Sequence, residues 1–183
     1  RSKLSRPQSK VGSFAKTPDQ NTKKKASLYK IEADLLFSEE TYDTAMQFYQ
    51  RALVLDPDNN SIRYKRGLAY EQQGQINLAE KDFQYILSID HNDSSVLNAL
   101  GYMLTVHTER LDEAHMLIKK AYQIDPEDSA IIDSLGWLYF KRGEMERAEY
   151  YLRKAFEGTK EPIIARHLIE VLNKQGQVHE AKI

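Results

Sequence analysis

Apolar residues recur along this chain at helical spacing, in pairs of segments joined by short polar turns. An Asp-Pro-like stop follows each pair, and the pattern then begins again. The clearest marker is an alanine that returns at steps of 34, 35, 34 and 33 residues, at Ala45, Ala79, Ala114, Ala148 and Ala181. A period of this length predicts stacked helical hairpins rather than one closed globule.

Small and large residues also keep a fixed register within each hairpin. We set the first position of each repeat at Ala26, Asn60, Ser94, Ser129 and Pro162. The eighth position is then Ala33, Gly67, Gly101, Gly136 and Ile169. The residue four after the periodic alanine is large: Tyr49, Phe83, Ile118 and Leu152. Because closely crossing helices need small residues facing large ones, this register predicts a close crossing inside the hairpins.

Over residues 26–183, this repeating pattern of small and large residues resembles the tetratricopeptide repeat family. The resemblance implies an all-α, right-handed superhelical solenoid of helix-turn-helix repeats. We expect about four full repeats and a partial fifth, at 26–59, 60–93, 94–128, 129–161 and 162–183. Gly74, Gly143 and Gly176 stand at the hairpin turns, whereas the first hairpin has Glu40 there. Proline in the stops ends one helix, and the neighbouring Asp or Asn can cap the next.

The first 25 residues differ in composition from the repeats. They hold eight cations and one anion, a net charge of +7, while the other residues carry −8 of the formal total of −1. We expect an irregular basic lead-in or linker, because few apolar residues are present to offset the entropy lost on ordering. Attachment to nucleic acid or an acidic membrane through Lys23–Lys25 is the alternative. Phe14 is the only aromatic residue in the segment, which disfavours base stacking.

The sequence offers little chemistry for catalysis. It has no cysteine, and its histidines never pair at three- or four-residue spacing, so no helix presents two imidazoles to a metal. We expect most of these histidines on the surface or in turns. Motifs for a phosphate loop or an activated nucleophile are also absent. We therefore predict no enzymatic activity, no metal site and no cofactor.

Function is expected instead on the concave face of the solenoid. In tetratricopeptide proteins the second, fifth, ninth and twelfth positions of the first helix line this groove. Here the middle of that stripe is rich in aromatic residues, which are good anchors for a partner. The alternative is that these residues complete the core between repeats. The candidate groove residues are Tyr64, Leu68, Asn98, Tyr102, Asp133, Trp137, Phe140 and Lys141.

The expected ligand is a protein or peptide segment with apolar side chains. Polar contacts would come from Asn98, Asp133 and Lys141, and the Asn98 amide suits the backbone of an extended peptide.

Two short sequence segments resemble one group of bacterial proteins more closely. These are Leu97–Tyr102 and Ile132–Tyr139, together with the Arg110–Ala114 turn. They look like the C-terminal repeats of tetratricopeptide lipoproteins tethered to the outer membrane, some of which are periplasmic adaptors for a carboxyl-terminal processing protease. The resemblance implies such a protease as partner and a periplasmic or outer-membrane location. A cytoplasmic location is the alternative.

Three function hypotheses follow. The first is a noncatalytic scaffold that captures a partner segment in the groove. The second is self-association, through the solenoid end near Ile183 and the acidic convex face. The third is anchorage to nucleic acid or membrane through residues 1–25.

Overall fold

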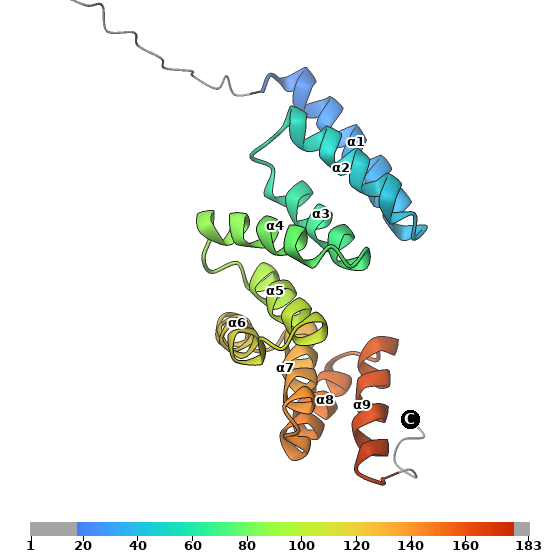
Figure 1. Ribbon diagram of the computed structural model, residues 1–183, viewed down its shortest axis with the longest axis vertical. Coiled ribbons are helices and arrows are strands. Elements are labelled where there is room, and N and C mark those ends of the chain that lie inside the picture. Colours follow the sequence, from blue (N-terminus) through green and yellow to red (C-terminus); the bar gives the residue numbers. More distant parts are fainter. Residues whose placement is uncertain (1–17, 178–183) are drawn as a thin grey trace, which may run out of the picture.

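The computed structural model describes residues 18–177, all of whose regular elements are α-helices. They are α1 (Gln20–Ser38), α2 (Tyr42–Leu55), α3 (Asn60–Gln72), α4 (Ile76–Ile89), α5 (Ser94–His107), α6 (Leu111–Ile124), α7 (Ser129–Lys141), α8 (Met145–Gly158) and α9 (Pro162–Lys174). Figure 1 shows these helices as hairpins stacked along the long axis, from α1 and α2 at one end to α9 at the other. The prediction of an all-helical solenoid is confirmed for this part of the chain.

The first helices of the second, third and fourth hairpins start at a side-chain cap. The side chains of Asn59, Asp93 and Asp128 accept hydrogen bonds from backbone N–H groups in the first turns of α3, α5 and α7. The helices α3, α5, α7 and α9 begin at Asn60, Ser94, Ser129 and Pro162, the first positions of the repeat register. Side-chain caps thus mark three of these repeat boundaries, and Pro162 at the start of α9 marks the fourth.

The first helix begins earlier than the sequence pattern predicts. Helix α1 starts at Gln20 because Asp19 caps it, accepting a hydrogen bond of 2.7 Å from the Thr22 N–H. The basic residues 23–25 are therefore helical and exposed rather than part of an irregular segment. Residues 1–17, which hold most of the predicted lead-in, lie outside the described residues. Ala181 and Ile183 at the other end lie outside them as well.

The core follows the repeat register. Each periodic alanine within the described residues is fully buried, and so is each large residue four positions later: Ala45, Ala79, Ala114, Ala148, Tyr49, Phe83, Ile118 and Leu152. A Cβ on Gly67 would come within 2.7 Å of the Phe83 ring, and one on Gly101 within 2.5 Å of Ile118 Cγ1. The close helix crossing predicted from the sequence is therefore present, and it leaves no room for a side chain.

Candidate partner-binding groove

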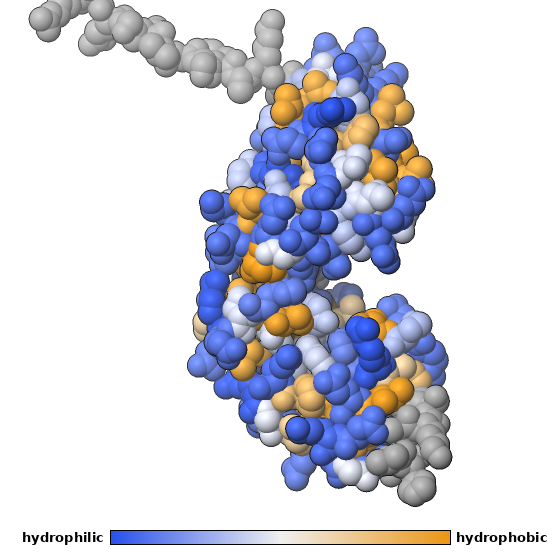
Figure 2. All heavy atoms as spheres, turned by 45° about the vertical axis from the view of Figure 1, so that its right-hand side comes forward, coloured by the Kyte–Doolittle hydropathy of each residue, from blue (hydrophilic) through white to orange (hydrophobic). Residues whose placement is uncertain are grey.

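A hollow of about 250 Å³ joins the first helices of four successive repeats. Its walls come from α3, α5 and α7, and α9 closes one end. The lining residues are Tyr64, Leu68, Glu71, Asn98, Ala99, Tyr102, Ala130, Asp133, Ser134 and Ile163. Because these residues are far apart in sequence, only the stacking of hairpins brings them together. The space-filling view shows that the molecule is deeply hollowed on one side, between its upper and lower halves (Figure 2).

Part of the predicted site gathers at this hollow. The predicted residues that line it are Tyr64, Leu68, Asn98, Tyr102 and Asp133. Tyr64 also lines a neighbouring hollow of about 360 Å³ with Asp93 and Val96, so its side chain borders both hollows.

Trp137 lies in the packing between helices rather than on the groove surface. Only 8% of its surface is exposed, and its ring stacks on the imidazole of His167, with centroids 4.1 Å apart. On its own helix it also stacks on Phe140, at 4.9 Å. The expectation that Trp137 is an exposed anchor is therefore corrected, because α9 supplies a flat ring that covers the indole.

Phe140 and Lys141 also lie away from the hollow. Phe140 is half-buried and packs against the main core. The Lys141 ammonium lies 5.7 Å from the centre of the Trp137 ring, and the residue lines a different hollow beside His107 and Thr108. The structure therefore gives these two residues no contact with the space that Tyr64 and Tyr102 share.

Asp133 already has a partner inside the protein. Its carboxylate lies 2.9 Å and 3.0 Å from Nδ1 of His167, and both side chains are almost completely buried. His167 is thus a core residue and an exception to the expectation that most histidines lie on the surface or in turns. His91 and His107 are at the surface, His115 is half-buried, and His179 lies outside the described residues. A buried carboxylate and imidazole in contact keep each other satisfied across the junction of α7 and α9.

Glu71 lines the hollow but is not among the candidate groove residues. It stands at the twelfth position of the second repeat and therefore belongs to the predicted groove stripe. The side chain is 9% exposed and lies 3.5 Å from Nε2 of His107. Burial raises the pKa of Glu71 to about 7 and lowers that of His107. At neutral pH the groove therefore holds a carboxyl group poised to gain or lose its proton.

The electrostatic environment of the groove is acidic. Burial first, and then the nearby carboxylates, raise the pKa of Tyr64, and the same causes raise that of Tyr102 to about 12. The carboxylates that act on Tyr64 are Asp93, Glu71 and Asp128, in that order. Arg166 acts on Tyr102 in the opposite sense. Both phenols therefore stay protonated at neutral pH and can donate a hydrogen bond.

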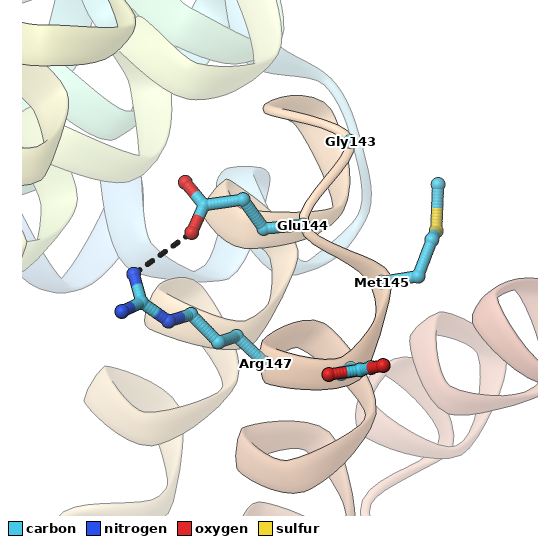
Figure 3. Close-up of a pocket in the computed structure, with 5 residues that line it drawn as sticks. Gly143, Glu144, Met145 and Arg147 are labelled. Atoms are coloured by element: carbon cyan, nitrogen blue, oxygen red, sulfur yellow. Dashed lines mark hydrogen bonds and ion pairs between the residues drawn. The ribbon is translucent and has the colours of Figure 1, made fainter.

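Another hollow, of about 410 Å³, lies at the start of α8. It is lined by the consecutive residues Gly143, Glu144, Met145, Glu146 and Arg147 (Figure 3). Glu144 and Arg147 point toward each other and form an ion pair of 2.8 Å, whereas Met145 points away. Because its walls belong to one turn and its charges are paired, this hollow joins no separate repeats.

Residues 18–177 show neither a metal centre nor a membrane span. Within this range no group of three or more carboxylate or imidazole side chains could hold a metal ion. In the same part of the chain, every helix is too short or too polar to span a bilayer.

The stacked hairpins and shared concave face define a helical-repeat solenoid. Family models described as TPR repeat and tetratricopeptide repeat match residues 33–74, 61–93 and 130–161. These matches, together with the relatives below, support the tetratricopeptide repeat family for this chain.

Curated relatives include two proteins of Pseudomonas aeruginosa. The TPR repeat-containing protein PA4667 is 36% identical over 143 residues, which is 78% of this chain and 24% of that protein. The type IV pilus assembly protein PilF is 23% identical over 136 residues, covering 73% of this chain and 54% of PilF. This chain therefore spans about a quarter of the first relative and about half of the second.

Solved structures show the same fold. TTC0263, a TPR protein of Thermus thermophilus, superimposes with a TM-score of 0.79 at 22% identity, covering 85% of this chain and 86% of its own. The type IV pilus biogenesis factor PilW gives 0.76 at 22% identity, covering 89% of this chain and 74% of its own. At this identity the likeness describes the fold alone.

Proposed function

We propose that this chain is a noncatalytic scaffold that holds a segment of a partner protein in its concave groove. The observation that carries the proposal is the hollow built by four successive repeats, with two tyrosines in its walls. Half-buried tyrosines with apolar neighbours are typical binding anchors, because the ring contributes apolar area and the hydroxyl a hydrogen bond. Tyr64, Leu68, Asn98 and Tyr102 would make the main contacts.

The finer form of the proposal is an envelope adaptor in a bacterium. It would present substrates to a carboxyl-terminal processing protease, in the periplasm or at the outer membrane. Support comes from the two sequence segments around Tyr102 and Trp137 and from the similarity to bacterial tetratricopeptide proteins. A cytoplasmic scaffold is the alternative location.

The test is a pull-down from a bacterial envelope extract, with mass spectrometry of the bound proteins. The wild-type chain is compared with a Tyr64→Ala/Tyr102→Ala variant. Tyr150→Ala is the matched control, since Tyr150 is 64% exposed and lies outside the groove. Circular dichroism checks that all three chains are folded.

We expect a partner that the wild type and Tyr150→Ala retain and the double variant loses. A processing protease in that set would support the adaptor form. Equal recovery by all three chains would contradict binding in the groove.

A second candidate function is self-association, which is favoured by an exposed apolar face of α1. Leu28, Ile31 and Leu35 are 65%, 64% and 54% exposed there. Leu28 and Leu35 hold the third and tenth positions of their repeat. The residues at the same positions in the later repeats are at most 2% exposed: Ile62, Val96, Ile131, Ile164, Ala69, Met103, Leu138 and Val171. An apolar stripe that is covered in every later repeat is a natural surface for another helix.

Light scattering on the purified chain tests this candidate. If α1 joins two copies, Leu28→Glu/Leu35→Glu should turn a dimer into a monomer without loss of helix content. A wild-type chain that is monomeric at all concentrations would exclude self-association through α1.

A further inference from the structure

The polar lining of the groove includes three side chains with acceptor oxygens. Glu71 and Asp133 contribute carboxylates, and Asn98 contributes an amide oxygen. Asn98 Oδ1 is buried and has no hydrogen-bond donor among residues 18–177. An acceptor that is removed from water without a donor costs the protein free energy. A ligand that brings a donor, met by rotation of the Asn98 amide toward the hollow, would remove this cost.

Glu71 is a second acceptor in the lining, and it carries a negative charge when it is ionised. Its side chain is more than nine-tenths buried and accepts no hydrogen bond within the described part of the chain. The titratable group beside it is His107, with Nε2 at 3.5 Å. Partial burial lowers the pKa of His107, so its ring is neutral at neutral pH. Buried carboxylates normally have charged or hydrogen-bonding partners. This one faces a hollow instead.

The rest of the hollow suits a long cationic side chain. Leu68, Ala99 and Ile163 offer an apolar wall for a methylene stem, which lysine and arginine both have. The rings of Tyr64 and Tyr102 can attract a cation through their faces. The carboxylates that act on these rings add to the attraction, whereas Arg166 opposes it.

We propose that the groove contains a subsite for the positively charged side chain of a lysine or arginine in the bound segment. Glu71 is its principal counter-ion, Asn98 Oδ1 is a second acceptor, and Tyr64 and Tyr102 flank the cation. Asp133 contributes negative charge but is already bonded to His167. The subsite deepens the proposed function and rests on it, because the cation arrives as part of the partner segment.

A random peptide library displayed on phage tests the subsite even while the natural partner is unidentified. Selection is carried out in parallel on the wild type, on Glu71→Gln and on Tyr64→Ala/Tyr102→Ala. Glu157→Gln on α8 is the matched control, since it removes the same charge from an exposed position outside the hollow. Circular dichroism confirms that every variant is folded.

Selected peptides are then synthesised with the basic residue or with norleucine in its place. Their affinities are measured by fluorescence anisotropy at pH 8. On the wild type and Glu157→Gln we expect enrichment of one lysine or arginine, and about tenfold weaker binding of the norleucine peptide. On Glu71→Gln the two peptides should bind with nearly equal affinity, since the interaction energy belongs to the pair.

The other outcomes separate the subsite from the groove itself. Peptides that depend on the two tyrosines but lack a common basic residue would overturn the subsite and leave the proposed function standing. An equal norleucine effect on the wild type and Glu71→Gln would also overturn it. If no peptide is enriched on the wild type, or if the same peptides are enriched on Tyr64→Ala/Tyr102→Ala, the result would count against both the subsite and the groove.

Discussion

The imidazole of His167 on α9 contacts the carboxylate of Asp133 on α7 through Nδ1, at 2.9 Å, across a boundary between repeats. The same imidazole stacks on Trp137, with centroids 4.1 Å apart. The His167 side chain thus makes both a polar contact and an aromatic contact where the last two described repeats meet. This cluster explains why Trp137 is unavailable as a surface anchor.

Removing one member of this pair should destabilise the solenoid. We expect Asp133→Ala to lower the free energy of unfolding by about 1–3 kcal/mol, because it leaves a buried imidazole without its partner. Urea denaturation followed by circular dichroism measures the change. Glu170→Ala, an exposed change on α9, should stay within about 0.5 kcal/mol of the wild type. Equal effects of the two substitutions would show that the pair contributes nothing to stability.

The close crossing inside the third hairpin should not tolerate a methyl group. In Gly101→Ala the new Cβ would lie 2.5 Å from Ile118 Cγ1 and 3.2 Å from the Ala114 carbonyl oxygen. We expect a loss of about 1–3 kcal/mol in unfolding free energy, because α5 and α6 must move apart. In the background of Ile118→Ala the same change should cost less, as the double-mutant cycle would reveal. If the effects of the two substitutions on the unfolding free energy are strictly additive, the strain of Gly101→Ala does not come from contact with Ile118.

The first hairpin turn is strained where the others are not. Glu40 has φ = 58°, a left-handed conformation that Gly74 and Gly143 adopt in the corresponding turns at 68° and 78°. We therefore expect Glu40→Gly to raise the unfolding free energy by about 0.5–1 kcal/mol. Gly143→Ala should lower it by about 1 kcal/mol. Thermal denaturation compares the two, and changes of the same sign would contradict this account.

Stability should depend on pH through Glu71. Its pKa lies near 7 in the folded chain and near 4.5 when the group is in water, so the folded state binds more protons between these values. The wild type should therefore lose stability as pH rises from about 4.5 through about 7, whereas Glu71→Gln lacks this loss. At pH 8 the variant should be more stable by on the order of 2 kcal/mol.

Denaturation of the two chains at several pH values measures this difference directly. The comparison is needed because the lowered pKa of His107 favours stability in the opposite direction, as pH rises through its usual range. His107 is present in both chains, so its contribution largely cancels. A pH-independent difference between wild type and variant would mean that Glu71 does not titrate near neutrality.

The repeat architecture could be read from the sequence because its cause is local. A small residue opposite a large one, as with Gly101 and Ile118, recurs at a fixed spacing. The caps at Asn59, Asp93 and Asp128 act within their own first turns. Each of these requirements involves neighbours within one hairpin, so periodicity reveals them. The start of α1 was missed because Asp19 caps a basic segment with no apolar periodicity.

The groove was only partly determined by the sequence. Helical periodicity gave the stripe that holds Tyr64, Leu68 and Tyr102, all of which line the hollow. It could not tell that α9 would bring His167 against Trp137 and Asp133, because that contact depends on how one repeat rotates on the next. The burial of Glu71 likewise depends on how neighbouring repeats pack. A repeating sequence determines what each hairpin is, whereas the packing between hairpins decides which side chains remain open to a partner.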